Sequence, residues 1–220
     1  MLSAAVSLRA EIRLPAFFAD NMVLQQQTQA NLWGWASPSK TVTVKTGWDG
    51  KTYTTTAAAD GKWKLAVETP VAGGPYDLTI SDGQPLTLKN VLIGEVWVCS
   101  GQSNMEMPMK GFKMQPVEGA NMDAAYSRNP RIRLFTVGLN SQTTPQDTVK
   151  GHWSEACAES VREFSATAYY FGRMLNRVLD GVPVGLIVTA WGGSACEAWM
   201  NPAWLKPEWM KNYKYPVPAP

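Results

Sequence analysis

The sequence of 220 residues contains a single histidine, His152, and only three cysteines. One histidine excludes the H-E-x-x-H motif and every zinc site that is built from two or more histidines. The cysteines Cys99, Cys157 and Cys196 are odd in number and show no C-x-x-C spacing, so a disulfide framework is not expected. A serine hydrolase with this sequence would have to use His152 as its base or take the base from outside the chain.

An excess of one charge sign and a long hydrophobic run are absent as well. The 20 Lys and Arg residues nearly balance the 18 Asp and Glu residues, so we expect no nucleic-acid partner. The best apolar run, residues 181–196, is shorter than the roughly 18 residues that cross a membrane, and it ends at Glu197. Residues 1–10 resemble the end of a secretory signal peptide, although no basic segment precedes the apolar residues. This interpretation predicts a secreted or periplasmic protein, or a lysosomal one in an animal.

Residues 11–93 have the pattern of a β domain. Polar and apolar side chains alternate over residues 41–44, 63–67 and 76–80, as in strands with one buried face. Asp-Gly pairs, which favour tight turns, lie between such runs at Asp49-Gly50, Asp60-Gly61 and Asp82-Gly83. This spacing predicts a small antiparallel β-sandwich. Core packing is favoured over a sugar-stacking platform for most of its tryptophans, which are Trp33, Trp35, Trp48 and Trp63.

Residues 94–220 have an α/β pattern instead. Nearly continuous apolar runs at 96–99, 132–137 and 184–190 are typical of strands that are covered on both faces. Residues 164–179 carry apolar side chains at helical spacing, namely Phe164, Ala168, Phe171, Leu175 and Val178. Strand, helix and strand in this order predict a parallel sheet. Three strands leave that sheet incomplete, because sheets usually have about 5–6.

Two glycine-containing turns follow these predicted strands. Gly101-Gln102-Ser103-Asn104 comes after the first, and Gly192-Gly193-Ser194 comes after the last. The carboxyl ends of parallel strands meet at one edge of a sheet, so both turns are expected at that edge. There Ser103 would be placed to attack a carbonyl, and a glycine N–H would be placed to stabilise an oxyanion. Taken alone, each segment is explained more simply as a tight turn, and Met105 replaces the second glycine of a G-x-S-x-G elbow.

The histidine itself is a weak candidate for a catalytic base. His152 lies in a polar stretch before the predicted helix, with no predicted strand end beside it. A surface or capping role is therefore favoured over general-base catalysis.

Four segments in chain order resemble those of a known family. They are residues 14–25, residues 94–107 with Gly101-Gln102-Ser103-Asn104-Met105-Glu106-Met107, residues 164–172, and residues 182–199 with Trp191-Gly192-Gly193-Ser194. Together they resemble the sialate O-acetylesterase family of carbohydrate esterases, which are SGNH-type hydrolases. The resemblance runs from about residue 11 to 205. It implies an SGNH or flavodoxin-like parallel sheet in residues 94–220, preceded by the β-sandwich of residues 11–93.

The resemblance also implies roles for individual residues. Ser103 becomes the expected nucleophile, with its own N–H and that of Gly193 or Gly192 as oxyanion donors. Four further residues of the matching segments become candidates for substrate binding: Gln102, Asn104, Trp191 and Glu197. The resemblance implies removal of O-acetyl groups from an O-acetylated sugar, sialic acid, by serine acyl transfer, and no metal or other cofactor is required.

One part of the family's machinery has no counterpart in this sequence. The Gln-Gly-Glu block and the Asp-x-x-His block of the family do not occur in residues 1–220. The catalytic base is therefore expected from a downstream segment or a second chain that carries Asp and His. An acetyl xylan esterase or another glycan deacetylase remains an alternative within the enzyme class. An inactive fragment or a carbohydrate-binding pseudoenzyme remains an alternative outside it.

Overall fold

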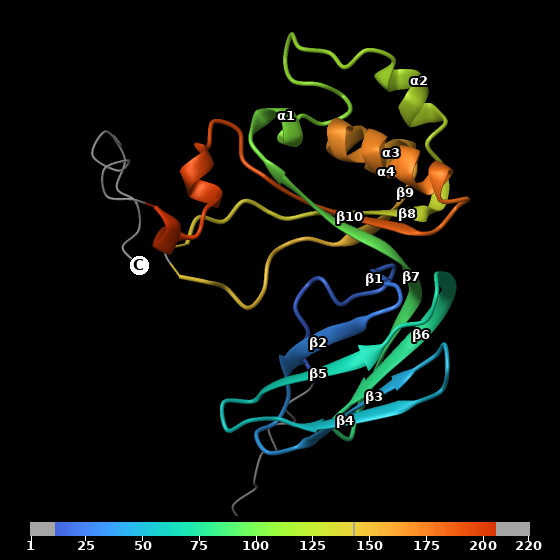
Figure 1. Cartoon of the computed structure of the whole chain (residues 1–220), viewed down its shortest axis with the longest axis vertical. Helices are drawn as coiled ribbons and strands as arrows, with labels where there is room; N and C mark the ends of the chain where they lie inside the picture. Colours follow the sequence, from blue (N-terminus) through green and yellow to red (C-terminus); the bar gives the residue numbers. More distant parts are fainter. Residues whose placement is uncertain (1–11, 143, 206–220) are drawn as a thin grey trace, which may run out of the picture. The chain divides into compact units, whose positions relative to one another are not determined.

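The computed structural model describes residues 12–142 and 144–205, which fall into two compact units, Met1–Glu95 and Val96–Pro220 (Figure 1). The segment 1–10, which the sequence suggests is a signal-peptide remnant, lies outside the described residues. In the parts that are described, no helix is both long and apolar enough to cross a membrane. The fold belongs to the predicted α/β class, with mixed strand pairing and a separate small antiparallel sheet.

The first unit is formed by two sheets. One sheet has the order β4-β3-β6-β7, with β1 also paired to β7, and the other consists of β2 and β5. The pairing is antiparallel, as predicted, except that β1 runs parallel to β7. The strands are β1 (Val23–Gln25), β2 (Gln29–Trp35), β3 (Thr41–Thr46), β4 (Thr52–Thr56), β5 (Lys62–Glu68), β6 (Gly73–Ser81) and β7 (Pro85–Gly101).

The tryptophans of this unit differ in burial. Trp63 is only 3% exposed and lies in the core, in keeping with the packing role that the sequence favours. Trp33 is half-buried and meets Phe18 edge to face, with ring centroids 4.6 Å apart. Trp48 is also half-buried, and its indole N–H donates to the Glu68 carbonyl. These rings are held by packing and hydrogen bonds within the unit.

The second unit contains the predicted strands and one more. The carboxyl-terminal part of β7 neighbours β10 (Val184–Ala190), which pairs in parallel with β8 (Asn129–Thr136). The additional strand, β9 (Trp153–Ala156), is antiparallel to β8, so the sheet is mixed and not purely parallel. The expectation that no strand end lies beside His152 was therefore wrong, because β9 begins at the next residue. A four-residue strand with buried residues only at its ends gives little periodic signal.

The helices of this unit are short except for one. They are α1 (Ser103–Glu106), α2 (Ala120–Ala125), α3 (Ala158–Glu163) and α4 (Ala166–Val178), followed by 3-10 turns at Cys196–Trp199 and Pro202–Trp204.

The long helix α4 begins with a proper cap and packs on the sheet. The Ser165 side chain accepts the Ala168 N–H, as an N-cap residue does. The buried positions include the small residues Ala168 and Gly172, which allow close contact with β10. Of the face predicted from apolar spacing, Phe171 and Val178 are instead 41% and 66% exposed. These two side chains lie off the buried face, while Ala168 of the same apolar row lies in the core.

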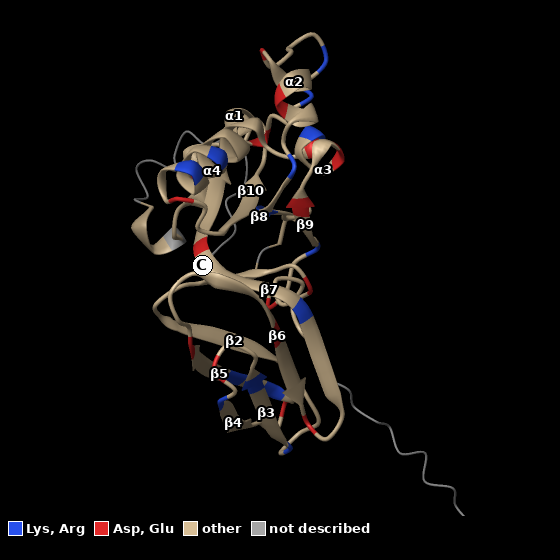
Figure 2. Ribbon diagram, turned by 90° about the vertical axis from the view of Figure 1, so that its right-hand side faces the viewer, with Lys and Arg blue, Asp and Glu red and all other residues tan. Residues whose placement is uncertain are grey.

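A polar cluster joins α2 to α4. Asp123 accepts hydrogen bonds of 2.6 Å from both the Tyr170 hydroxyl and the Arg173 guanidinium. These bonds hold the pKa of Asp123 below its usual range, while burial and the neighbouring carboxylate raise the pKa of Tyr170 to about 12. Figure 2 shows acidic segments on α2 and α3 and basic segments on α4. The cluster therefore stabilises the fold in the charged form of Asp123.

This cluster predicts a pH-dependent contribution to stability. A carboxyl group whose pKa is lower in the folded state stabilises the fold above its unfolded pKa of about 3.9 and loses this effect as the pH falls through the folded value. We expect Asp123→Asn to lower the free energy of unfolding by about 1 kcal/mol at pH 7, since the cluster is partly exposed. Urea unfolding at pH 7 and pH 3 measures this difference, which should shrink at pH 3. An equal difference at both pH values would contradict the assignment.

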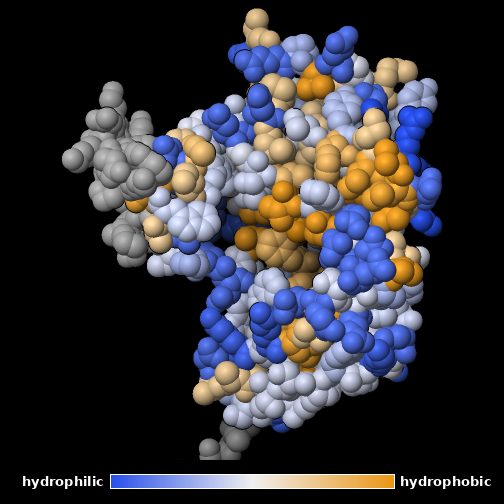
Figure 3. All heavy atoms as spheres, viewed as in Figure 1, coloured by the Kyte–Doolittle hydropathy of each residue, from blue (hydrophilic) through white to orange (hydrophobic). Residues whose placement is uncertain are grey.

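The second unit also carries an exposed apolar face. Figure 3 shows hydrophobic side chains gathered on the face that carries α4. Phe171 and Met174 are exposed there, and Phe171 meets Trp97 of β7 with ring centroids 5.0 Å apart. Trp97 and Val98 are 42% and 65% exposed, so the prediction that this run is covered on both faces was wrong for the described residues. An apolar run shows that a strand can be buried, but it does not show what covers the strand.

Candidate active site

The predicted nucleophile lies at the end of β7. The strand ends at Gly101, and Ser103 is the exposed first residue of α1. Gln102 is the N-cap residue, and its carbonyl accepts the N–H groups of Met105 and Glu106 at 2.9 Å. The chain therefore reverses sharply after the strand and leaves Ser103 at the surface of the turn.

Contacts with α4 hold this turn in place. The Met107 carbonyl accepts the Ala166 N–H at 2.9 Å, so the chain after α1 is tied to the first turn of α4. The Thr167 hydroxyl donates to the Asn104 carbonyl at 3.0 Å. Met105 packs against the core of the unit, and Met109 is fully buried in it. The exposed serine thus has a rigid support beneath it.

The second predicted turn lies beside the first. The Trp191 N–H donates to the Gly101 carbonyl at 3.0 Å, which joins the end of β10 to the end of β7. A Cβ atom placed on Gly192 would lie 3.7 Å from the Cβ of Ser103. The structure therefore brings together two segments that are about 90 residues apart in the sequence.

Glu106 forms the closest link between the two turns. Its carboxylate accepts the backbone N–H of Gly192, and a Cβ on Gly192 would lie only 2.5 Å from the same oxygen. Of the two amides considered as oxyanion donors, that of Gly192 is thus already bound within the protein. Gly193 follows with a φ of 77°, is exposed, and has no atom other than those of its chain neighbours within 4 Å of the place where a Cβ would stand. The open backbone of Gly193 makes it the better candidate for contacting a ligand.

Sequence reasoning did not assign a role to Glu106. The only available signal was its position three residues after Ser103, which places both on one side of a single helical turn. Nothing in that spacing indicates a bond to Gly192, because the partner comes from a separate strand end.

The candidate substrate-binding residues are placed around these turns. Gln102 and Asn104 flank Ser103, and both are exposed. Trp191 is 41% exposed at the end of β10. Glu197 is half-buried and belongs to the 3-10 turn Cys196–Trp199. All four lie at the carboxyl ends of the strands or in the segments that follow them.

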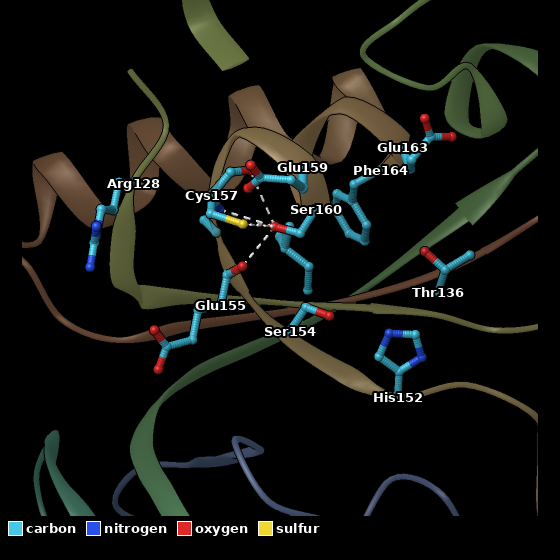
Figure 4. A pocket seen from close by; sticks show the side chains of 12 residues that line it. Arg128, Thr136, His152, Ser154, Glu155, Cys157, Glu159, Ser160, Glu163 and Phe164 are labelled. Atoms are coloured by element: carbon cyan, nitrogen blue, oxygen red, sulfur yellow. Dashed lines mark hydrogen bonds between the residues drawn. The ribbon is translucent and has the colours of Figure 1, made fainter. Parts of the chain in front are cut away.

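His152 lies in a different place. It is exposed and lines a cavity of about 650 Å³ together with Thr136, Ser154, Glu155 and Glu163, as Figure 4 shows. Ser103 is not among the residues that line this cavity. The structure therefore does not place His152 and Ser103 in one cavity.

The same cavity carries a small network around Cys157. The Ser160 hydroxyl donates to the Glu155 carbonyl at 2.6 Å, and Ser160 also contacts the Cys157 thiol (Figure 4). The same two residues begin helix α3 with a capping box, in which the Ser160 hydroxyl accepts the Cys157 N–H at 3.0 Å. Within residues 12–142 and 144–205, no group of three or more His, Cys, Asp and Glu side chains is arranged to hold a metal ion.

Comparison with known proteins adds a family to this geometry. The family model described as "Carbohydrate esterase, sialic acid-specific acetylesterase" matches residues 93–216, more than half of the chain and all of the site described above. The chain belongs to this carbohydrate esterase family.

Individual members of the family and a solved structure agree with this assignment. The chain is 30% identical to the sialate O-acetylesterase of Homo sapiens over 204 residues, which cover 86% of the chain and 39% of that protein. It is also 30% identical to the sialate O-acetylesterase of Mus musculus over 221 residues, covering 91% and 40%. A crystal structure of a carbohydrate acetylesterase from Xanthomonas citri is 35% identical, with a TM-score of 0.81 over 92% of this chain and 44% of that one. The chain thus spans about two fifths of the length of these carbohydrate esterases.

Proposed function

We propose that this carbohydrate esterase chain supplies two parts of a site that removes O-acetyl groups from sugars. They are the nucleophile, Ser103, and the turn Gly192-Gly193, which we call the oxyanion loop. The observation that carries the proposal is the position of exposed Ser103 next to the Gly192-Gly193 turn, at the meeting ends of β7 and β10. A serine hydroxyl beside open backbone N–H groups is the arrangement that acyl transfer requires.

The proposed reaction has two steps. The Ser103 Oγ bonds to the acetyl carbonyl carbon and gives its proton to a histidine, and the N–H groups of Ser103 and Gly193 stabilise the oxyanion. The tetrahedral intermediate then breaks its bond to the sugar oxygen, which leaves with the proton from that histidine. Water, deprotonated by the same histidine, attacks the acetyl-enzyme and releases acetate and Ser103.

We propose that the histidine and its aspartate come from another segment or a second chain. His152 lines a cavity of which Ser103 is not part, and the chain spans about two fifths of the length of its relatives. In a serine triad the base must lie within hydrogen-bond distance of the nucleophile.

The family description and the named relatives make O-acetylated sialic acid the first substrate to test. An uncharged acetylated glycan such as acetyl xylan is the second candidate, because uncharged side chains surround Trp191 at the end of β10. A secreted or periplasmic location, or a lysosomal one in an animal, would place the protein where glycans are found.

Acetate release tests the proposed function. The chain is incubated with O-acetylated sialic acid, acetylated xylan and an aryl acetate, alone and together with the remaining portion of a family member that carries the Asp-x-x-His block. Hydrolysis that requires this second polypeptide supports the proposal. Sugar binding without hydrolysis in either condition would reject it in favour of a carbohydrate-binding protein.

The bond between Glu106 and Gly192 makes Glu106 a positioning residue in this proposal. Glu106→Ala should lower the kcat for an aryl acetate roughly tenfold with little change in KM, because the oxyanion loop loses its anchor. Glu106→Gln should retain most of the activity, because the amide oxygen can still accept the Gly192 N–H. Glu118→Ala, at an exposed position, is the matched control. Equal losses in both Glu106 variants, or a change in KM alone, would contradict the positioning role.

A further inference from the structure

A second cavity opens at the same end of the sheet as the candidate active site. It has a volume of about 360 Å³ and is lined by residues that follow β8 and β10, among them Trp191 and Trp199. Trp191 directly precedes Gly192, which lies next to Ser103 in space. The Trp191 N–H donates to the Gly101 carbonyl. The wall of this cavity and the oxyanion loop are thus consecutive parts of one segment. A volume of this size lies at the lower end of the range for small-molecule sites, roughly 300–1,000 Å³.

The two tryptophans are held by one serine. The Ser194 hydroxyl donates to the Trp191 carbonyl at 2.7 Å, and the Trp199 indole N–H donates to the Ser194 oxygen at 2.8 Å. Both tryptophans are 41% exposed, so part of each side chain is open to a ligand. The Trp199 indole is therefore oriented before any ligand binds, which lowers the entropy cost of binding, while the bond to Trp191 holds its backbone.

The rest of the lining is polar but uncharged. It consists of three amide side chains, Asn140, Gln142 and Gln146, three threonines and a few aliphatic residues. The Gln142 amide donates to the Asn140 side-chain oxygen at 2.8 Å, and the Gln146 amide donates to Thr144. No Asp, Glu, Lys, Arg or His lines the cavity among the residues that the structure describes. Amides and hydroxyls can both donate to and accept from the hydroxyl groups of a sugar.

We propose that this cavity binds an uncharged sugar residue of the acetylated substrate, with Trp199 and Trp191 contacting the apolar face of the ring. The inference rests on the proposed esterase function and selects a neutral glycan as the substrate class. A sugar carboxylate in the cavity would lose its water without gaining a cationic partner from the described lining residues, which disfavours an anionic sugar there. Ser194 is then a positioning residue that orients the Trp199 indole and holds the backbone of Trp191.

Binding measurements test the proposal without depending on turnover. The Ser103→Ala chain is titrated with acetylated xylotetraose and, separately, with 9-O-acetylated N-acetylneuraminic acid, by calorimetry and by the NMR signal of the Trp199 indole N–H. We expect the neutral sugar to shift that signal and to bind at least tenfold more tightly than the anionic one. Adding Trp199→Ala should raise the Kd for the neutral sugar roughly tenfold, and Ser194→Ala should raise it by a smaller factor.

Trp204→Ala is the matched control, because Trp204 is 69% exposed and does not line the cavity. It should leave the Kd unchanged. If the neutral sugar neither shifts the Trp199 signal nor binds more weakly after Trp199→Ala, the cavity is not its site. Tighter binding of the anionic sugar that depends on Trp199 would likewise overturn the proposal. The NMR signal of the chain with Trp199 intact tests the cavity even if Trp199→Ala does not fold.

The esterase proposal is tested separately by acetate release. Hydrolysis by the wild-type chain with its complementing polypeptide, without a neutral-sugar shift at Trp199, rejects the cavity and keeps the esterase. A specific shift at Trp199 in a chain that never becomes hydrolytic supports the cavity and rejects the esterase.

Discussion

Replacing Ser103 with alanine should lower the kcat for acetyl ester hydrolysis by about 10⁴-fold or more. The variant keeps the backbone N–H groups at Ser103 and Gly193, so some stabilisation of the oxyanion remains, but no acyl-enzyme can form. The side chain is exposed at the start of α1, and its removal should leave the fold intact. Acetate release under conditions in which the wild-type chain turns over, with a parallel thermal unfolding measurement, checks both expectations.

Ser141→Ala provides the control for this variant. Ser141 is also exposed, but it lines neither of the two cavities described above. It should retain full activity. If Ser103→Ala turned over normally while His152→Ala did not, the chemistry would have to be assigned to the cavity of Figure 4.

Much of the candidate site could be predicted because parallel strands impose a simple geometry. Two buried strands, each followed by a glycine-containing turn, were enough to predict that Ser103 and Gly192 would lie at one edge of the sheet. The structure places them in adjacent positions, where a Cβ added to Gly192 would lie 3.7 Å from the Cβ of Ser103. That inference needs only the strand pattern and the turn residues, both of which are local features of the sequence.

The contacts that determine which glycine is available could not be predicted in this way. The bond from Gly192 to Glu106 joins a strand end to a helical turn about 86 residues away in the sequence. No periodicity encodes such a pair. The same holds for Ser194, whose sequence context is that of a turn and whose structural role is to hold Trp191 and Trp199. Long-range polar contacts of this kind are visible only once the fold brings the segments together.

The errors in the fold have a similar origin. The apolar spacing of residues 164–179 correctly predicted a helix, but Phe171 and Val178 of the apolar row are exposed, whereas Asn176 is buried. The strand β9 was missed because four residues carry too little pattern to distinguish a strand from a loop. The buried side of α4 and the pairing of β9 both depend on the segments that these elements pack against. A single sequence does not specify those segments.

Gly192→Ala should reduce kcat for acetyl ester hydrolysis roughly tenfold, because it breaks the same anchor as Glu106→Ala does. The backbone at Gly192 does not have the positive φ of Gly193, so alanine is conformationally acceptable there. The obstacle is space, because the new Cβ would lie 2.5 Å from the Glu106 carboxylate that binds the Gly192 N–H. The carboxylate ends a flexible side chain and is the group that moves, which breaks its bond to the Gly192 N–H and leaves the Gly192-Gly193 turn without that anchor.

A double-mutant cycle separates this steric cause from any other. With Glu106→Ala the obstacle is gone, and the remaining contact of 3.7 Å to the Ser103 Cβ is an ordinary van der Waals distance. We therefore expect the double variant Glu106→Ala/Gly192→Ala to lie within about threefold of Glu106→Ala alone, since contacting residues are not additive. If the glycine substitution costs the same factor in both backgrounds, the Glu106 contact is not its cause. The oxyanion loop would then have to be held by other contacts, and the proposed positioning role of Glu106 would be rejected.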